Sequence, residues 1–433
     1  YYRPISLLSV VSKPLEKHIH HHIQTFIENN NLFHDFQSGF RENHSCHTAL
    51  ARLCDTWLNA INDKKLTGAV FVDFKKAFDL VNHNLLIQKL EIYLQNNSTV
   101  SLLQSFLSSR TQHVYINGTH SRPGNIQSGV PQGSVLGPLL FCLFINDLPK
   151  HFTNKDVCCD LFADDSTLHT SSKSLNTINV ALQQTVNDVS LWCKNNDMII
   201  HPQKTKCMII TSRQKHQLGP LPLTLNLSNE PIEQVQCHKV LGVFIDCKMQ
   251  WLEHISHVCK KVSRNLYLLK KLTRYVDSDS RKRFFYAHCL SHINYASTVW
   301  SEAADNHLMK LNSLHRRGAK LILSDVNMPT SSKLKELDIL PLASQFELNL
   351  AVFVLKVRLN KLPSYLSLFL IKPSERYGSL RYLYPNAKID LMESSFGFRG
   401  ATVWNSLPSE LKLSTSVFGF KKRVRKQLTL LDT

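Results

Sequence analysis

Residues 158–169 read Cys-Cys-Asp-Leu-Phe-Ala-Asp-Asp-Ser-Thr-Leu-His. Two short arms of strand-forming residues, Cys159–Phe162 and Ser166–His169, flank Asp164 and Asp165, which predicts a tight β-hairpin with both carboxylates near its apex. An Asp-Asp pair in a turn is usually turn chemistry alone. Here two like charges follow an apolar arm, and a bound cation would stabilise them beside a core. The stretch therefore favours a cation-binding hairpin over a simple surface turn.

A third acid lies at the end of another predicted strand. The apolar run Ala69–Phe74 contains Asp73, and the stretch that follows it, Lys75–Leu94, is compatible with a helix. Two divalent cations that act on a phosphoryl group require carboxylate oxygens from different elements of the fold. A strand end and a hairpin apex would supply them, and Mg²⁺ is the expected ion.

Regular hydrophobic patterns surround these two segments. Helical and strand-like segments alternate up to about residue 241, and beyond it the chain is mainly helical, which predicts an α+β fold. A domain boundary is expected near residues 245–255. The predicted helices cover residues 12–29, 46–63, 136–146 and 176–194, residues 198–211 are predicted as a strand, and residues 113–130 are turn-rich.

The helix predicted over residues 255–274 carries two different faces. A basic stripe that contains an aromatic ring suits the backbone of a nucleic acid. The alternative is an ordinary surface helix with a solvated basic side. The apolar stripe consists of Ile255, Val258, Val262, Leu266, Leu269 and Leu272, and the basic stripe of Lys260, Arg264, Tyr267, Lys271 and Arg274.

The composition is that of a folded, strongly basic protein. Of the 433 residues, 43% are hydrophobic and 19% are charged, so the chain can bury two or three cores. Lys and Arg number 51 against 33 acidic residues, a net charge of +18. This excess suits a polyanionic partner, although charge alone also describes a solvated basic surface. Further basic clusters that suit phosphate contacts lie at residues 281–283, 315–320 and 421–426.

The eleven cysteines do not form a disulfide or zinc pattern. Their number is odd and none is spaced as Cys-x-x-Cys, so we expect them to be reduced inside a cell. A set of Cys and His residues between positions 237 and 259 has spacings that match no standard zinc site, and core or surface roles are expected for it. The histidines at positions 18 and 20–22 are expected on the exposed side of a helix.

No membrane partner is expected. The most apolar run, Leu136–Ile145, has about half of the roughly 20 residues that a membrane-spanning helix needs. The sequence starts at Tyr1 without an initiator Met, which suggests a piece of a longer polypeptide.

Seven segments resemble, in order and spacing, the successive motifs of LINE-type (non-LTR) retrotransposon reverse transcriptases. The similarity continues to Trp404-Asn-Ser-Leu-Pro408, which resembles the C-terminal tail of jockey-like elements. The seven are Tyr2-Arg-Pro-Ile-Ser6, Gln37-Ser-Gly-Phe-Arg41, Phe71-Val-Asp-Phe-Lys-Lys-Ala-Phe-Asp79, Gly129-Val-Pro-Gln-Gly-Ser134, Phe162-Ala-Asp-Asp165, Lys204-Thr-Lys206 and Leu241-Gly-Val243.

The resemblance implies an α+β right-hand polymerase that uses an RNA template. Its parts would be N-terminally truncated fingers at residues 1–67, and a palm with an antiparallel sheet and inserted fingers and helical segments at residues 68–245. A helical thumb at residues 246–325 and a tail of unassigned role at residues 326–433 would follow. The implied reaction is two-metal nucleotidyl transfer, in which a primer 3′-hydroxyl is extended with dNTPs.

The resemblance also assigns the catalytic and metal-binding positions. Asp73 and Asp164 would each contact both Mg²⁺ ions, for which Mn²⁺ can substitute. Asp165 would assist them, and the carbonyl of Phe74 would complete one coordination shell. Lys204 would donate a proton near the leaving pyrophosphate, although it could simply be a Lys beside a strand. His201 stands where the family more often has Asn, which puts the geometry of this loop in question.

Four positions are expected to contact the incoming nucleotide. Arg41 would bind the triphosphate through its planar guanidinium, with Arg3 as a second candidate. Phe78 would exclude the sugar 2′-hydroxyl, or it could be only a core aromatic. Gln132 and Gly133 would form a platform for template and nucleotide, or an ordinary turn.

The expected partners are an RNA template, a DNA primer and dNTPs, and an endonuclease domain is expected upstream in the full-length protein. The expected location is nuclear, at chromatin, and in cytoplasmic ribonucleoprotein. Two other readings stay open from the sequence: a catalytically inactive nucleic-acid-binding remnant, and a group II intron-type maturase.

Overall fold

The computed structural model describes residues 6–323, 328–369, 373–374 and 378–431. Arg3 and most of the motif at residues 2–6 lie outside them. The fold mixes helices with sheet, as expected, and the chain forms two compact units. The first unit comprises Tyr1–Ser45, Thr67–Ile209 and Leu221–Val235, and the second comprises Cys46–Leu66, Ile210–Pro220 and Gln236–Thr433.

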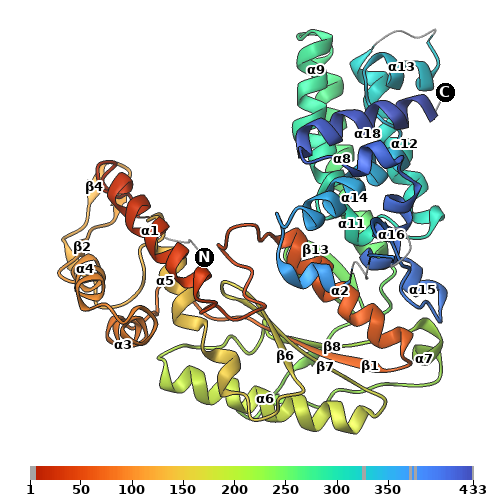
Figure 1. Cartoon of the computed structure of the whole chain (residues 1–433). Coiled ribbons are helices and arrows are strands. Elements are labelled where there is room, and N and C mark those ends of the chain that lie inside the picture. Colours follow the sequence, from red (N-terminus) through yellow and green to blue (C-terminus); the bar gives the residue numbers. More distant parts are fainter. Residues whose placement is uncertain (1–5, 324–327, 370–372, 375–377, 432–433) are drawn as a thin grey trace. The chain divides into compact units, whose positions relative to one another are not determined.

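A five-stranded sheet in the order β11-β8-β1-β7-β6 organises the first unit (Figure 1). Strands β6 (Cys158–Phe162) and β7 (Asp165–Ser172) are antiparallel, with Phe162 opposite Asp165. The side chains of Thr67, near the start of β1 (Leu66–Val72), and Ser171, near the end of β7, share a hydrogen bond of 2.8 Å. Neighbouring strands β1 and β7 therefore run in opposite directions, and the end of β1 lies at the same edge as the start of β7.

Helix α6 (Leu175–Asn195) covers one face of this sheet (Figure 1). Its predicted apolar face is confirmed, because Ile178, Leu182, Val186, Val189 and Trp192 are all buried. At Gly68 in β1, an added Cβ would lie 2.3 Å from the side chain of Ile178, so this glycine allows the close approach of helix and strand.

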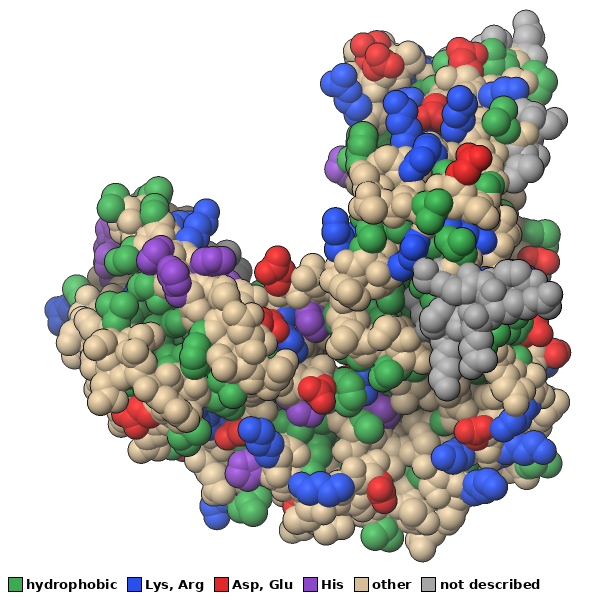
Figure 2. Space-filling model, viewed as in Figure 1, with side chains coloured by type: hydrophobic (Ala, Val, Ile, Leu, Met, Phe, Trp, Pro, Cys, Tyr) green, Lys and Arg blue, Asp and Glu red, His purple; other side chains and the backbone are tan. Residues whose placement is uncertain are grey.

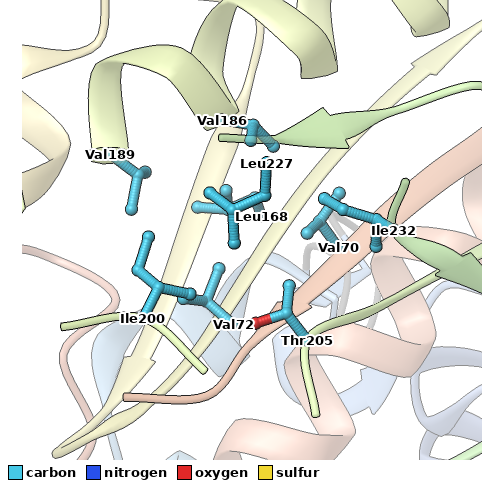
Figure 3. Close-up of a pocket in the computed structure, with 9 residues that line it drawn as sticks. All are labelled: Val70, Val72, Leu168, Val186, Val189, Ile200, Thr205, Leu227 and Ile232. Atoms are coloured by element: carbon cyan, nitrogen blue, oxygen red, sulfur yellow. The ribbon is translucent and has the colours of Figure 1, made fainter. Parts of the chain in front are cut away.

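A small apolar cavity of about 10 Å³ remains between α6 and the sheet (Figure 3). A space this small holds at most about one water molecule, and its apolar walls favour leaving it empty. It is a packing defect rather than a nucleotide site. The side chains around it are Val70, Val72, Leu168, Val186, Val189, Ile200, Thr205, Leu227 and Ile232.

Two predicted elements of this unit were wrong in extent. The helix expected over Lys75–Leu94 begins only at His83, because the side chain of Asn82 accepts hydrogen bonds from the first-turn N–H groups of Asn84 and Leu85. The strand expected over residues 198–211 is reduced to β8 (Lys206–Ile210), because residues 199–201 pair with the chain after β1 instead.

The other predicted elements of the first unit are confirmed, and the apolar run of α5 is almost wholly buried. The elements besides β1, β6, β7, β8 and α6 are α1 (Ser12–Asn29), α3 (His83–Leu94), α4 (Asn97–Leu107), β2 (Thr111–Gln112), β3 (Tyr115–Ile116), β4 (Thr119–His120), β5 (Gly124–Asn125), α5 (Leu136–Ile145), the 3₁₀ helix η1 (Leu148–His151), β9 (Asn226–Leu227), β10 (Glu230–Pro231) and β11 (Glu233–Gln234).

The second unit is mainly helical and joins segments far apart in the sequence. Asp55 in α2 (Cys46–Asn62) accepts hydrogen bonds from the N–H groups of Phe396 and Gly397, at 2.7 and 2.8 Å, at the start of α16 (Phe396–Ser406). Trp404 in α16 is fully buried and stacks on Phe420. The two units group the chain differently from the expected domains: residues 46–66 belong with residues 236–433, and the first unit resumes at Thr67, one residue before the expected start of the palm. The expected boundary at 325/326 lies outside the described residues.

None of the described helices is long and apolar enough to cross a bilayer. The remaining elements of the second unit are α7 (Arg213–Gln217), β12 (Cys237–Val240), β13 (Val243–Asp246), α8 (Leu252–Leu272), α9 (Ser278–Phe285), the π-helix η2 (Tyr286–Leu290), α10 (Ser291–Asn294), α11 (Ser297–Trp300), α12 (Asp305–Ile322), α13 (Thr330–Glu336), α14 (Leu342–Arg358), the 3₁₀ helix η3 (Ser364–Leu368), β14 (Pro373–Ser374), β15 (Gly378–Tyr382), α15 (Asp390–Glu393), α17 (Ser409–Lys412) and α18 (Val417–Leu431).

Candidate active site

The turn between β6 and β7 carries the acid pair, as predicted. It consists of Ala163 and Asp164, and Ala163 adopts the left-handed backbone conformation with φ of 55°. Ala163 is buried, whereas Asp164 is half-buried and Asp165, which opens β7, is exposed. The turn thus keeps its first residue in the core and presents the carboxylate-bearing residues at the surface.

Asp73 follows the last residue of β1, and its backbone is held from both sides. Its N–H donates to the hydroxyl of Thr205 at 3.3 Å, and its carbonyl accepts the N–H of His201 at 2.7 Å. Phe74 pairs with Ile200 in the same antiparallel bridge, and its side chain is buried. The hydrogen bond between His201 and Asp73 is made by backbone atoms, so it is kept with His in place of the family's usual Asn.

The side chain of Asp73 remains 42% exposed, at the sheet edge where the Asp164 turn also lies. Within the described residues, no three His, Cys, Asp or Glu side chains form a set that could hold a metal ion by themselves. In nucleotide-transferring sites, however, Mg²⁺ is usually bound by one or two carboxylates together with substrate phosphates and water. The donor set at this edge fits that arrangement rather than an all-protein cage.

Lys204 lies beside Asp73, with 3.9 Å between its Nζ and Oδ1 of the carboxylate. Its side chain is 63% exposed, so a pair of this kind adds little to stability and leaves the ammonium able to move. The structure therefore places Lys204 at the predicted site, with Asp73 as its neighbour.

Of the predicted nucleotide contacts, Arg41 makes the most hydrogen bonds to other described residues. Its guanidinium forms a two-point ion pair with Glu28, at 2.9 and 2.6 Å, and also donates to the carbonyls of His34 and Gln37. Burial raises the pKa of the nearby Cys142 thiol to about 12, against a smaller opposing effect of Arg41. A triphosphate that binds Arg41 at two points would compete with Glu28 for the guanidinium.

The other predicted nucleotide contacts lie around α5. The ring of Phe78 is half-buried and stacks on Phe141, with ring centres 4.3 Å apart. Gln132 donates from its side-chain amide to Asp79 at 2.8 Å. Gly133 has a φ of 121°, and a Cβ there would lie 2.8 Å from the carbonyl oxygen of Ser6, so the loop depends on glycine at this position.

Three residues with structural roles in the site carry no assignment from the sequence. Gln37 and Thr205 accept hydrogen bonds from backbone N–H groups beside the acids, and Glu28 pairs with Arg41. Gln37 lies within a motif that the sequence comparison singles out, but its contact is with a residue 126 positions away. No local pattern predicts such a contact.

The two-faced helix of the second unit is observed as α8, which ends at Leu272, so Arg274 of the predicted basic stripe lies in the turn after the helix. All of its predicted apolar stripe is buried except Leu272, which is half-buried, and all five residues of the basic stripe are exposed. Lys271 lies over the ring of Tyr267 at 4.8 Å. Lys and Arg side chains are also numerous on the molecular face drawn in Figure 2, where His side chains gather over α1.

The Cys and His residues near α8 do not form a zinc site among the described residues. His254 is buried and accepts a long hydrogen bond of 3.4 Å from the N–H of Phe244. Burial, with smaller contributions from the neighbouring His257 and Lys261, lowers its pKa to about 4. It is a neutral core histidine.

The sequence of this chain is similar to those of known polymerases. A family model described as "Reverse transcriptase (RNA-dependent DNA polymerase)" matches residues 1–245. The probable RNA-directed DNA polymerase from transposon BS of Drosophila melanogaster is 31% identical over 74% of this chain and 36% of its own length. The RNA-directed DNA polymerase from mobile element jockey of the same organism is also 31% identical, over 74% of this chain and 35% of its own length.

The chain thus spans little more than a third of the curated relatives it matches. Among solved structures, apo telomerase from Candida tropicalis aligns with a TM-score of 0.44 and 10% identity, over 74% of this chain and 53% of that one.

Proposed function

Because this chain belongs to the reverse transcriptase (RNA-dependent DNA polymerase) family, and resembles its non-LTR retrotransposon members, we propose that it extends a primer 3′-hydroxyl with dNTPs on an RNA template. The observation that carries the proposal is the shared sheet edge of Asp73 and the Asp164 turn, since nucleotidyl transfer requires carboxylates from separate elements at one point. In this proposal the sheet would serve as the palm and α8 with its neighbours as the thumb of a right-hand polymerase, and the tail belongs to the same unit as α8.

The family uses divalent metal ions, and Mg²⁺ is the ion proposed for this chain, with Mn²⁺ able to replace it. Asp73 and Asp164 would hold two ions, with help from Asp165 and the Phe74 carbonyl. When bound, the ions lower the pKa of the primer hydroxyl and neutralise charge on the triphosphate.

The chain's own side chains would donate a proton, select the nucleotide and contact the nucleic acid. Lys204, exposed and close to Asp73, would move to protonate the leaving pyrophosphate. Phe78 would exclude a ribose 2′-hydroxyl, and Gln132 with Gly133 would support the base pair being formed. Arg41 would exchange Glu28 for the triphosphate. The exposed stripe of α8 would follow the nucleic-acid backbone.

Primer extension tests the proposal. Wild type is given a DNA primer on an RNA template with dNTPs and Mg²⁺, beside Asp164→Asn and the control Asp156→Asn, an exposed acid before β6. Extension by wild type and the control, with loss of at least about 10³-fold in Asp164→Asn, supports the enzyme reading. Binding without extension by wild type would instead support the inactive remnant.

The maturase alternative is not favoured, since the two fly relatives match 74% of the chain and are named as polymerases of mobile elements. An upstream endonuclease in the full-length protein, and a location at chromatin and in cytoplasmic ribonucleoprotein, belong to the same proposal.

A further inference from the structure

A loop segment from the Gln37 motif lies against the strand that leads into the acid-bearing turn. Gln37 forms a parallel bridge with Leu161 in β6. The N–H of Leu161 donates to the carbonyl of Phe36 at 3.0 Å, and the N–H of Ser38 donates to the carbonyl of Leu161 at 2.8 Å. Residues 36–38 therefore behave as a short additional strand on the outer edge of β6.

The side chain of Gln37 continues from this segment to the turn itself. It is fully buried, and its Oε1 accepts two hydrogen bonds, from the N–H of Gly39 at 2.8 Å and from the N–H of Ala163 at 3.3 Å. Its Nε2 is buried and has no hydrogen-bond partner among the residues that the structure describes. A buried amide with an unpartnered end is costly, so the two bonds of its oxygen must be what retains it there.

Gly39 approaches the turn from the same side. A Cβ built on it would lie 2.3 Å from the backbone nitrogen of Ala163 and 3.0 Å from the carbonyl carbon of Phe162. Both atoms are backbone, so neither can rotate away. Only glycine allows the loop to pack this closely on the turn.

The turn needs such external support. Ala163 is a non-glycine residue at φ 55°, a conformation that L-residues adopt rarely unless the surrounding structure fixes it. Its N–H is directed to Gln37, and Asp164 is the next residue along the chain. The orientation of the Ala163 peptide thus sets the direction in which Asp164 leaves the turn.

We propose that Gln37 and Gly39 form a clamp on the Ala163 turn, and that Gln37 is a positioning residue which orients Asp164 toward its metal ion. This inference rests on the proposed polymerase function for its catalytic consequence. The clamp itself is a property of the fold and can be tested without turnover.

The first test measures the turn directly. Hydrogen exchange of the peptide that spans residues 160–166 is followed in wild type, Gln37→Met and Gly39→Ala. Loss of one hydrogen bond and of the close contact should accelerate exchange of this peptide roughly tenfold in both variants. Gln37→Glu, which keeps an acceptor oxygen, should retain the protection. Gln24→Met on α1 and Gly124→Ala, where an added Cβ meets nothing within 4 Å, are the matched controls.

The second test measures the effect on the metal site. Mn²⁺ binding to the free protein, followed by electron paramagnetic resonance, should be weakened about threefold or more in Gln37→Met and Gly39→Ala but not in the two controls. In primer extension, the same variants should lose about tenfold in kcat and need more Mg²⁺ for half-maximal rate, with primer–template affinity within twofold of wild type.

The outcomes separate the two proposals. Unchanged exchange at residues 160–166 and unchanged Mn²⁺ binding in both variants overturn the clamp, whatever the activity. A wild-type protein that fails to extend a primer overturns the polymerase function and leaves the clamp to be decided by exchange and Mn²⁺ binding. A uniform fall in kcat with an unaltered Mg²⁺ dependence shows that Gln37 is only structural.

Discussion

Replacing Phe78 with Val tests whether this ring selects deoxynucleotides, and the structure allows the cost to be estimated. The change removes four carbons, worth roughly 3 kcal/mol if fully buried at about 0.8 kcal/mol each, and roughly half of that for a half-buried ring. Loss of the stack on Phe141 adds about 1 kcal/mol. We therefore expect Phe78→Val to lower the free energy of unfolding by about 2–3 kcal/mol, leaving a folded protein for assay.

The functional effect should be much larger for ribonucleotides than for deoxynucleotides. Because the ring is backed by Phe141, it cannot retreat from a 2′-hydroxyl, and removing it should raise the kcat/KM ratio of rNTP to dNTP by about 10- to 100-fold. Single-nucleotide incorporation with each class of substrate measures this ratio, and urea unfolding measures the stability. Phe26→Val, an exposed position on α1, is the control. An unchanged ratio in a folded Phe78→Val protein would refute the gate and leave Phe78 as a core aromatic.

Three further changes probe separate contacts. Glu28→Gln weakens the partner of Arg41 and should lower KM for dNTPs about threefold to tenfold, whereas an unchanged KM in steady-state kinetics would mark Arg41 as a structural brace. Burial raises the pKa of Asp55 to about 7, above its unfolded value, so the folded state binds more protons and wild type should lose stability as pH rises from about 4 to 7. In urea unfolding at pH 5 and 8, Asp55→Asn should not show this loss of stability. A pH dependence equal to that of wild type would contradict the role given to Asp55. Replacing Lys260 and Arg264 together by Gln should reduce the slope of log affinity against log salt by roughly two. A slope equal to that of wild type would show that neither residue contacts phosphate.

The sequence predicts the parts of this fold that local patterns determine. The helix over residues 12–29 and the hairpin around Asp164 follow from periodicity and turn composition, and both are observed. The predicted extent of an element is wrong where a distant segment determines the strand pairing. Residues 199–201 look like the start of a strand, but they pair with the chain after β1 rather than continuing β8.

The site shows the same division. Asp73, Asp164 and Lys204 are predictable from motif resemblance, and the structure brings Lys204 next to Asp73. Two contacts depend on packing between segments, so no spacing in the sequence predicts them: that of Gln37 with Ala163 and that of Arg41 with Glu28. The grouping of the tail with α2 likewise depends on packing between distant segments.

The capping of α16 by Asp55 sets an order of events during synthesis. Helix α2 is synthesised before the rest of this unit, but the N–H groups that its buried carboxyl requires belong to residues made 341 and 342 positions later. A unit closed by contacts so distant in sequence folds slowly, since a long loop must be ordered before those contacts form. The Asp55 contacts that close the second unit can therefore form only after residues 396 and 397 have been translated.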